Sequence, residues 1–195
     1  MGVKFESENT LLRVWLLLHR VRDAFFLCED SVFADYGLTT EQFTLLAAVK
    51  GGGGSLRPSD LASYMERSPN SVSMLVDRMV KAGLVKRTRD RKDRRVVNVT
   101  LTGKGEKAAE QAAPAGWELV QKLLSPVLDR DVHVLASLLE TIKCECLGYL
   151  NPGVDMAKIV KGSVTSRPDL YKEWTKTFPS SAQVRRQEAR RKKAG

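Results

Sequence analysis

Apolar side chains recur at helical spacing near the start of the chain, and they predict one long helix over about residues 7–33. One face of this helix carries Leu11, Leu12, Trp15, Leu18, Val21 and Phe25. The opposite flank is also apolar in part, with Val14, Leu17 and Phe26. A helix that is apolar over so much of its surface needs cover on more than one side, either from its own domain or from a second subunit.

A helix-turn-helix pattern follows. A short helix is expected from Thr40, taken as its N-cap, to about residue 49. Pro58 suits the first position of the next helix, and Ser68 and Pro69 suit the cap and first position of another after a tight connection at residues 66–68. Glycine often follows helix C-termini, so Gly83 is expected to end that helix. Its inward stripe is Val72, Leu75, Val76, Met79 and Val80.

Beyond Gly83 the pattern changes to alternation, which predicts two short strands at residues 84–88 and 96–101. The run 89–95 between them holds five basic and two acidic side chains. Helix, turn, helix and then a hairpin with a charged tip is the element order of a winged helix-turn-helix. Two more helices are expected at about 103–124 and 129–150. The predicted fold class is therefore mainly α, with a small two-stranded β wing and a helical region beside it.

Charge is unevenly distributed along the chain, whose net charge is +9. Residues 56–101 and 153–195 carry net charges of +6 and +7, whereas residues 1–55 and 102–152 carry −2 each. Such segregation is typical of a polyanion-binding module attached to nearly neutral scaffolding. A solvated surface that is merely rich in lysine and arginine is the other interpretation.

Several classes of protein are disfavoured. No apolar run approaches the length of a membrane span, and no leader peptide is evident, so a cytoplasmic protein with no membrane partner is expected. Three cysteines and two histidines form neither a disulfide framework nor a spaced zinc motif, and we expect no metal and no cofactor. The same scarcity, with no nucleophile-elbow motif or clustered acid pair, argues against an enzyme.

The helix after Ser68 has the properties of one that enters the major groove of DNA. Its outward face is mostly small and polar, and its positive dipole end would lie near phosphates. Simple helix capping explains Ser68 and Pro69 but not a whole uncharged polar face beside a basic hairpin. The residues predicted to contact DNA from this helix are Ser68, Pro69, Asn70, Ser71, Ser73, Met74 and Arg78.

The hairpin tip is predicted to reach the minor groove, where a narrow groove attracts arginine. Asp93 would repel phosphate unless it held a neighbouring arginine through a bidentate pair. The tip residues predicted to contact DNA are Arg89, Arg91, Lys92, Asp93, Arg94 and Arg95.

These motifs together resemble the MarR family of bacterial transcriptional regulators over about residues 7–150. The matching runs are 38–43, 56–62, 68–79, 83–85, 93–95 and 101–102. The resemblance implies a homodimer that binds pseudo-palindromic double-stranded DNA. It divides the matching part of the chain into a helical dimerisation region (7–36 and 102–150) and a winged helix-turn-helix DNA-binding domain (37–101). The basic composition and weak periodicity of residues 151–195 predict a weakly ordered C-terminal tail, whose segment around 170–178 is expected to dock on the body through Tyr171 and Trp174. The tail is not part of the usual family pattern.

The resemblance also implies a repressor switched by a small anionic aromatic ligand or, alternatively, by an oxidant. Trp15, His19, Arg22 and Phe26 share one helical stripe and offer an aromatic wall, a donor and a cation for such a ligand. A buried tryptophan and a satisfied histidine in a dimer interface are the competing interpretation. Cys28 is the candidate redox thiol, although the adjacent Glu29 and Asp30 oppose a lowered thiol pKa. A basic protein that binds nucleic acid without sequence preference is the remaining alternative.

Overall fold

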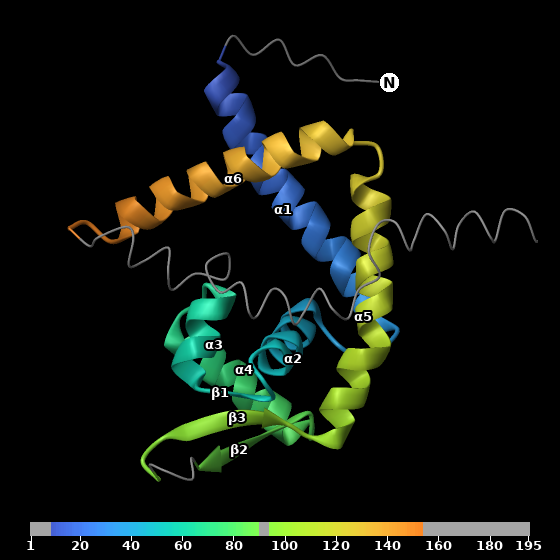
Figure 1. The fold of residues 1–195 in the computed structure, drawn as a ribbon, viewed down its shortest axis with the longest axis vertical. Helices are drawn as coiled ribbons and strands as arrows, with labels where there is room; N and C mark the ends of the chain where they lie inside the picture. Colours follow the sequence, from blue (N-terminus) through green and yellow to red (C-terminus); the bar gives the residue numbers. More distant parts are fainter. Residues whose placement is uncertain (1–8, 90–93, 154–195) are drawn as a thin grey trace, which may run out of the picture.

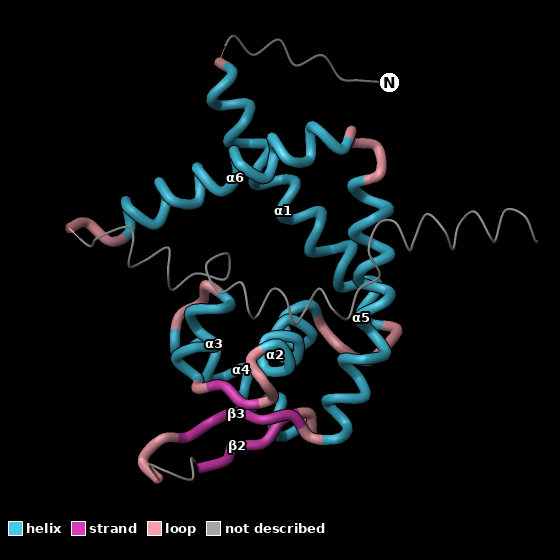
Figure 2. Tube along the Cα trace, in the orientation of Figure 1, coloured by secondary structure: helices cyan, strands magenta, loops and turns pink. Residues whose placement is uncertain are grey.

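The computed structural model describes residues 9–89 and 94–153, and within these residues the chain is mostly helical with a small sheet (Figures 1 and 2). This confirms the predicted fold class. The helices are α1 (Thr10–Ala34), α2 (Thr40–Gly51), α3 (Pro58–Met65), α4 (Pro69–Lys81), α5 (Gly103–Leu124) and α6 (Asp129–Leu150). The strands are β1 (Ser55–Leu56), β2 (Val85–Arg89) and β3 (Val97–Leu101).

The sheet has three antiparallel strands in the order β1-β3-β2, one more than the sequence predicted. β2 pairs with β3 along its whole length, from Val85 opposite Leu101 to Arg89 opposite Val97. The additional strand, β1, pairs Leu56 with Val99. A strand of two residues is too short to show alternation, so the hydrophobic pattern contained no sign of it.

The core of the molecule surrounds α2. Leu45, Leu46 and Val49 are fully buried, because α3, β3 and α5 cover the helix from different sides. The N-cap is Thr39 rather than the predicted Thr40, since the Thr39 hydroxyl accepts from the backbone N–H of Gln42 at 3.3 Å. The Gln42 side chain in turn accepts from the backbone N–H of Thr39, which completes a capping box.

The elements gather into two regions connected by α5 (Figure 1). The helices α2–α4 and the sheet form one compact module, which we call the winged module (residues 39–101). The helices α1 and α6 lie at the other end, where they overlap in the view of Figure 1, and α5 runs alongside both regions. α1 contacts α5 and α2 near its end, where the rings of Phe33 and Phe43 stack at 4.1 Å.

The outer region is poorly covered by its own chain. In the described part of the protein α6 buries no side chain, and α1 buries only Phe33. Across the same residues no helix is both long and apolar enough to cross a bilayer. The broad apolar surface expected for the first helix is therefore present and still exposed.

Candidate nucleic-acid interface

Helix α4 begins as the sequence predicted. Ser68 is the N-cap, and its hydroxyl accepts from the backbone N–H of Ser71 at 3.2 Å, with Pro69 at the first helical position. The hydroxyls of Ser68 and Ser71 also lie 2.8 Å apart. Each hydroxyl can take part in more than one hydrogen bond, so both can still bind an external group from this exposed turn.

The outer face of α4 is open to solvent. Asn70, Ser71 and Arg78 are exposed, Ser73 is half-buried, and Met74 is 66% exposed. The predicted inward stripe of α4 is buried except at its last member. Val80 is 38% exposed, because it lies one residue past Met79, beyond the edge of the covered face. The face without core contacts is therefore the polar one.

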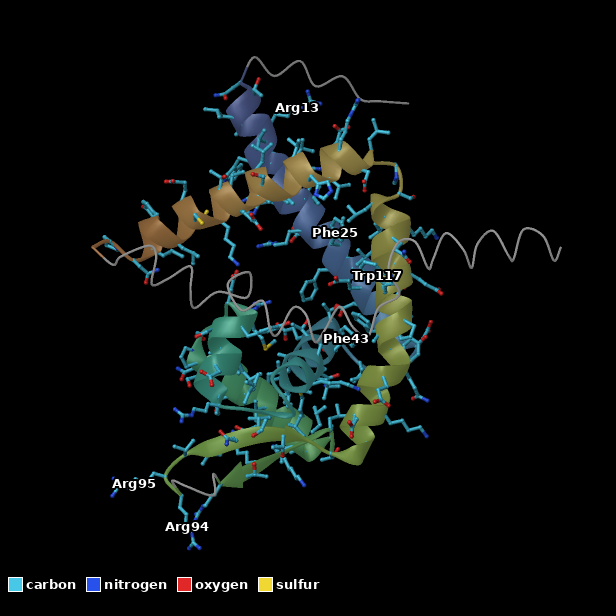
Figure 3. The ribbon with its side chains drawn as sticks, viewed as in Figure 1. Arg13, Phe25, Phe43, Arg94, Arg95 and Trp117 are labelled. Atoms are coloured by element: carbon cyan, nitrogen blue, oxygen red, sulfur yellow. The ribbon has the colours of Figure 1, made fainter. Side chains whose placement is uncertain are left out.

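Three exposed arginines lie at one end of the wing. Arg89 is exposed at the end of β2, and Arg94 and Arg95 are exposed just before β3. Figure 3 shows Arg94 and Arg95 at the tip of the hairpin, projecting away from the body of the protein. The other three predicted tip residues, Arg91, Lys92 and Asp93, lie outside the described residues, as does the tail from residue 154.

An ion pair that the sequence analysis missed joins the wing to α4. The Arg87 guanidinium on β2 donates to the Asp77 carboxylate on α4 at 2.5 Å. The two residues are ten positions apart on elements of different type, so no helical or strand period signals the contact. The pair neutralises the acid on the outer flank of α4 and links the wing to the helix.

The base of the wing is held by a second group of hydrogen bonds. The Thr102 hydroxyl donates to the carbonyl of Gly83 at 2.6 Å and lies 3.1 Å from that of Leu84. Gly83 has a φ of +70°, the left-handed conformation that glycine tolerates beyond a helix end. Lys104 donates to the carbonyl of Ala82 at 2.9 Å. The end of α4, the start of β2 and the start of α5 therefore meet at one joint.

A pocket lies beside the first half of α4. Glu41 of α2 forms an ion pair with Arg67 across it at 3.2 Å. The pocket is lined by Glu41, Met65, Arg67, Ser71, Val72, Met74, Leu75 and Arg78. Because three of these residues are also predicted DNA contacts, the pocket opens onto the same surface.

The four predicted effector-binding residues lie along exposed α1 in the single chain. The rings of Trp15 and His19 meet edge to face at a centroid distance of 4.8 Å, and Trp15 is 56% exposed. Arg22 donates to the carboxylate of its neighbour Asp23 at 2.8 Å. Phe26 is partly exposed. Different aromatic residues, Phe25, Phe43 and Trp117, line the junction of α1, α2 and α5 (Figure 3).

Cys28 lies in a half-buried, acidic stretch of α1. Its neighbour Glu29 has a pKa raised above the ordinary value of 4.5, first by burial and then by the negative charge of Asp30. Asp30 accepts from the backbone N–H of Thr40 at 2.7 Å, linking α1 to α2. All three cysteines are free thiols. Among the described residues no group of three histidine, cysteine or acidic side chains is placed to bind a metal ion.

Comparisons with known proteins agree with this geometry. A model described as the MarR family matches residues 36–96. The HTH-type transcriptional repressor MdtR of Bacillus subtilis (strain 168) is 30% identical over 113 residues, which cover 56% of this chain and 72% of MdtR.

Two solved structures are similar in fold. An organohalide-sensing transcriptional regulator bound to 2,4-dichlorophenol has a TM-score of 0.67 at 22% identity, covering 78% of this chain and 94% of that protein. A mutant MarR of E. coli complexed with operator DNA has a TM-score of 0.63 at 24% identity, covering 69% and 96%. At these identities the likeness shows a shared fold.

Proposed function

The chain belongs to the MarR family of DNA-binding transcriptional regulators, and from that premise we propose that it is a homodimeric repressor of a pseudo-palindromic operator, released by a small anionic aromatic ligand. One observation carries the DNA-binding part of this proposal. The exposed polar face of α4 and the arginine-tipped wing are joined by the Arg87–Asp77 ion pair into a single surface.

In the proposed complex α4 enters the major groove. Asn70 and Ser71 in its first turn are short donors and acceptors suited to base edges, and Met74 offers an apolar contact for a thymine methyl group. Arg78, one turn further along, reaches a guanine edge or a phosphate. Ser68, Pro69 and Ser73 flank these contacts. The first turn of α4 contains no acidic side chain, so its positive end can approach a phosphate.

The wing then lies along the backbone toward the neighbouring minor groove. Arg89 and Arg94 provide exposed cations in the described part of the tip. Minor-groove insertion of arginine is favoured by the concentrated negative potential of a narrow groove. Arg91, Lys92, Asp93 and Arg95 complete the proposed contact set.

The homodimer is supported by apolar surface that a soluble chain does not leave uncovered. The proposed dimerisation region is that predicted from the sequence, residues 7–36 and 102–150. On α1 the exposed large apolar residues are Leu11, Leu12, Val14, Trp15, Leu16, Leu17, Val21, Phe26 and Leu27. On α6 they are Val134, Leu135, Leu138, Leu139, Ile142, Tyr149 and Leu150. Two-fold pairing through these helices would place two α4 helices on successive major grooves, about 34 Å apart.

Repression and release by a ligand are supported by the relatives. MdtR is named a repressor, and one structural neighbour is bound to a phenol. In this chain Trp15, His19, Arg22 and Phe26 would contact the effector where the second subunit covers α1. The redox alternative, with Cys28 as the reactive thiol, is kept as an outcome of the effector test.

The DNA-binding proposal is tested by selecting binding sequences from random duplexes with the purified protein and footprinting the selected sites. We expect paired, inverted half-sites. Ser71→Ala and Arg94→Ala should each weaken operator binding by about tenfold or more, on the scale of 1–3 kcal/mol for a specific contact. Lys122→Ala, on the last turn of α5, removes the same charge far from the wing and should bind normally. Normal binding by both interface variants would contradict the assignment.

The effector proposal is tested on the selected operator with a panel of phenols and aromatic acids. A ligand of this class should release the DNA from the wild-type protein and from Cys28→Ser, but not from Arg22→Met. Release by peroxide that is lost in Cys28→Ser would instead support the redox alternative.

A further inference from the structure

The turn between α3 and α4 contains an unusual backbone conformation. Glu66 ends α3 with φ 51° and ψ 42°, and no other residue of the described chain except glycine has a positive φ. Glycine usually occupies a helix-ending position of this kind, because a β-carbon strains the left-handed conformation. A strained residue that persists at such a position points to a role for its side chain.

That side chain forms a long-range contact. The Glu66 carboxylate forms an ion pair with the Nζ of Lys143 on α6, and the two side chains are 48% and 28% exposed. Glu66 lies two residues before Ser68, the N-cap of α4. The ion pair therefore connects α6 directly to the turn that leads into α4.

The connection lies on the opposite side of the winged module from its other attachment. On one side α5 packs against both α1 and α2, and Phe33 stacks on Phe43. On the other side lies α3, and the C-terminal half of α6 extends above it (Figure 1). A module held only along the α1–α5 side could tilt about that side. A contact between α6 and the far turn restricts the tilt.

We propose that the Glu66–Lys143 ion pair, which we call the strut, fixes the distance between the two α4 helices of the dimer. This distance determines which spacing of the two DNA half-sites the protein accepts. This inference rests on the proposed function, because α6 must belong to the dimer for the strut to act. Glu66 and Lys143 are then positioning residues that need not touch the DNA. Their effect appears in spacing preference rather than in the bases that are read.

The experiment uses the full-length protein and the duplex selected by the wild type. Binding is measured on that duplex and on versions with the two half-sites moved closer or apart by one base pair, about 3.4 Å. The wild type should discriminate against the altered spacings. Glu66→Gln and Lys143→Met should each lose discrimination by up to about fivefold per subunit, the scale of a partly exposed ion pair.

Two further variants separate the strut from a general charge effect. Lys50→Met removes a lysine whose Nζ pairs with Glu110 at 2.6 Å, between α2 and α5, and it should keep the wild-type spacing ratio. The charge-reversed double variant, Glu66→Lys with Lys143→Glu, has the wild-type net charge and should restore discrimination.

Two results would overturn the inference in distinguishable ways. If the single variants are folded and keep the wild-type spacing ratio, the strut is refuted while the regulator proposal stands. If the wild-type protein selects no paired half-sites, the proposed function fails and the strut fails with it.

Discussion

Gly105 provides a sharp test of the joint that orients the wing. It is buried in the first turn of α5, and a β-carbon added at this position would lie 2.0 Å from the carbonyl oxygen of Leu84. Contacts of that length do not occur, and the obstacle is backbone rather than a flexible side chain. Gly105→Ala must therefore push the start of α5 away from the start of β2.

The expected cost follows from the contacts that would be disturbed. Overpacking of a tight interior contact costs about 1–3 kcal/mol. The Thr102 backbone N–H donates to the Leu84 carbonyl at 3.1 Å, and the Gly105 backbone N–H donates to the Thr102 hydroxyl at 3.1 Å. Weakening these two bonds adds about 1 kcal/mol apiece. Replacing a glycine inside a helix by alanine stabilises the folded state by roughly 1 kcal/mol, because alanine loses less backbone freedom on folding. The net loss is about 2–4 kcal/mol, which lowers Tm by roughly 4–16 °C in a chain of this size.

A control lies two residues away. Gly103 begins the same helix, and a β-carbon added there would have nothing within 4 Å, so Gly103→Ala should be neutral or slightly stabilising. Thermal unfolding followed by circular dichroism compares the two variants with the wild type under the same conditions. A Gly105→Ala protein that melts within about 1 °C of the wild type would refute the close approach of α5 and β2.

Three further predictions concern other parts of the molecule. Because the pKa of Glu29 is raised in the folded chain, its ionised form costs stability at neutral pH. Glu29→Gln should therefore raise Tm at pH 7, with the advantage disappearing as the pH falls below 4.5, and an equal gain at every pH would contradict this. Leu138→Asp on exposed α6 should convert a sedimenting dimer into a folded monomer, whereas an unchanged mass would exclude α6 from the interface. Asp77→Asn should free the Arg87 side chain and lower the ratio of operator to non-specific binding about threefold, the scale of a partly exposed ion pair, in competition assays. An unchanged ratio would show that this ion pair does not position the wing.

The sequence predicted much of the winged module because its signals are local. The buried stripe of α4 repeats at helical spacing, and Ser68 and Pro69 mark its start with side chains that act within one turn. Alternation around Val99 marks β3. The polar face of α4 follows directly, since a helix that buries one stripe must expose the other.

The less successful predictions involved signals that were absent or ambiguous over a short range. β1 is too short to alternate, and Thr39 and Thr40 are equally good caps until the fold buries one of them. Val80 fits the helical period but lies beyond the edge of the covered face. For the cap of α2 and for Val80, the outcome depended on how much of the helix its neighbours cover.

By itself the sequence determined the helices and the two longer strands of this protein, their order and the polar face of α4, because hydrophobic period, capping and turn chemistry act over a few residues. Only the tertiary structure decided which distant groups meet: Arg87 with Asp77, Glu66 with Lys143, and the Gly105 backbone with the Leu84 carbonyl. Such contacts depend on how whole elements are placed in space. No spacing along the chain encodes that placement.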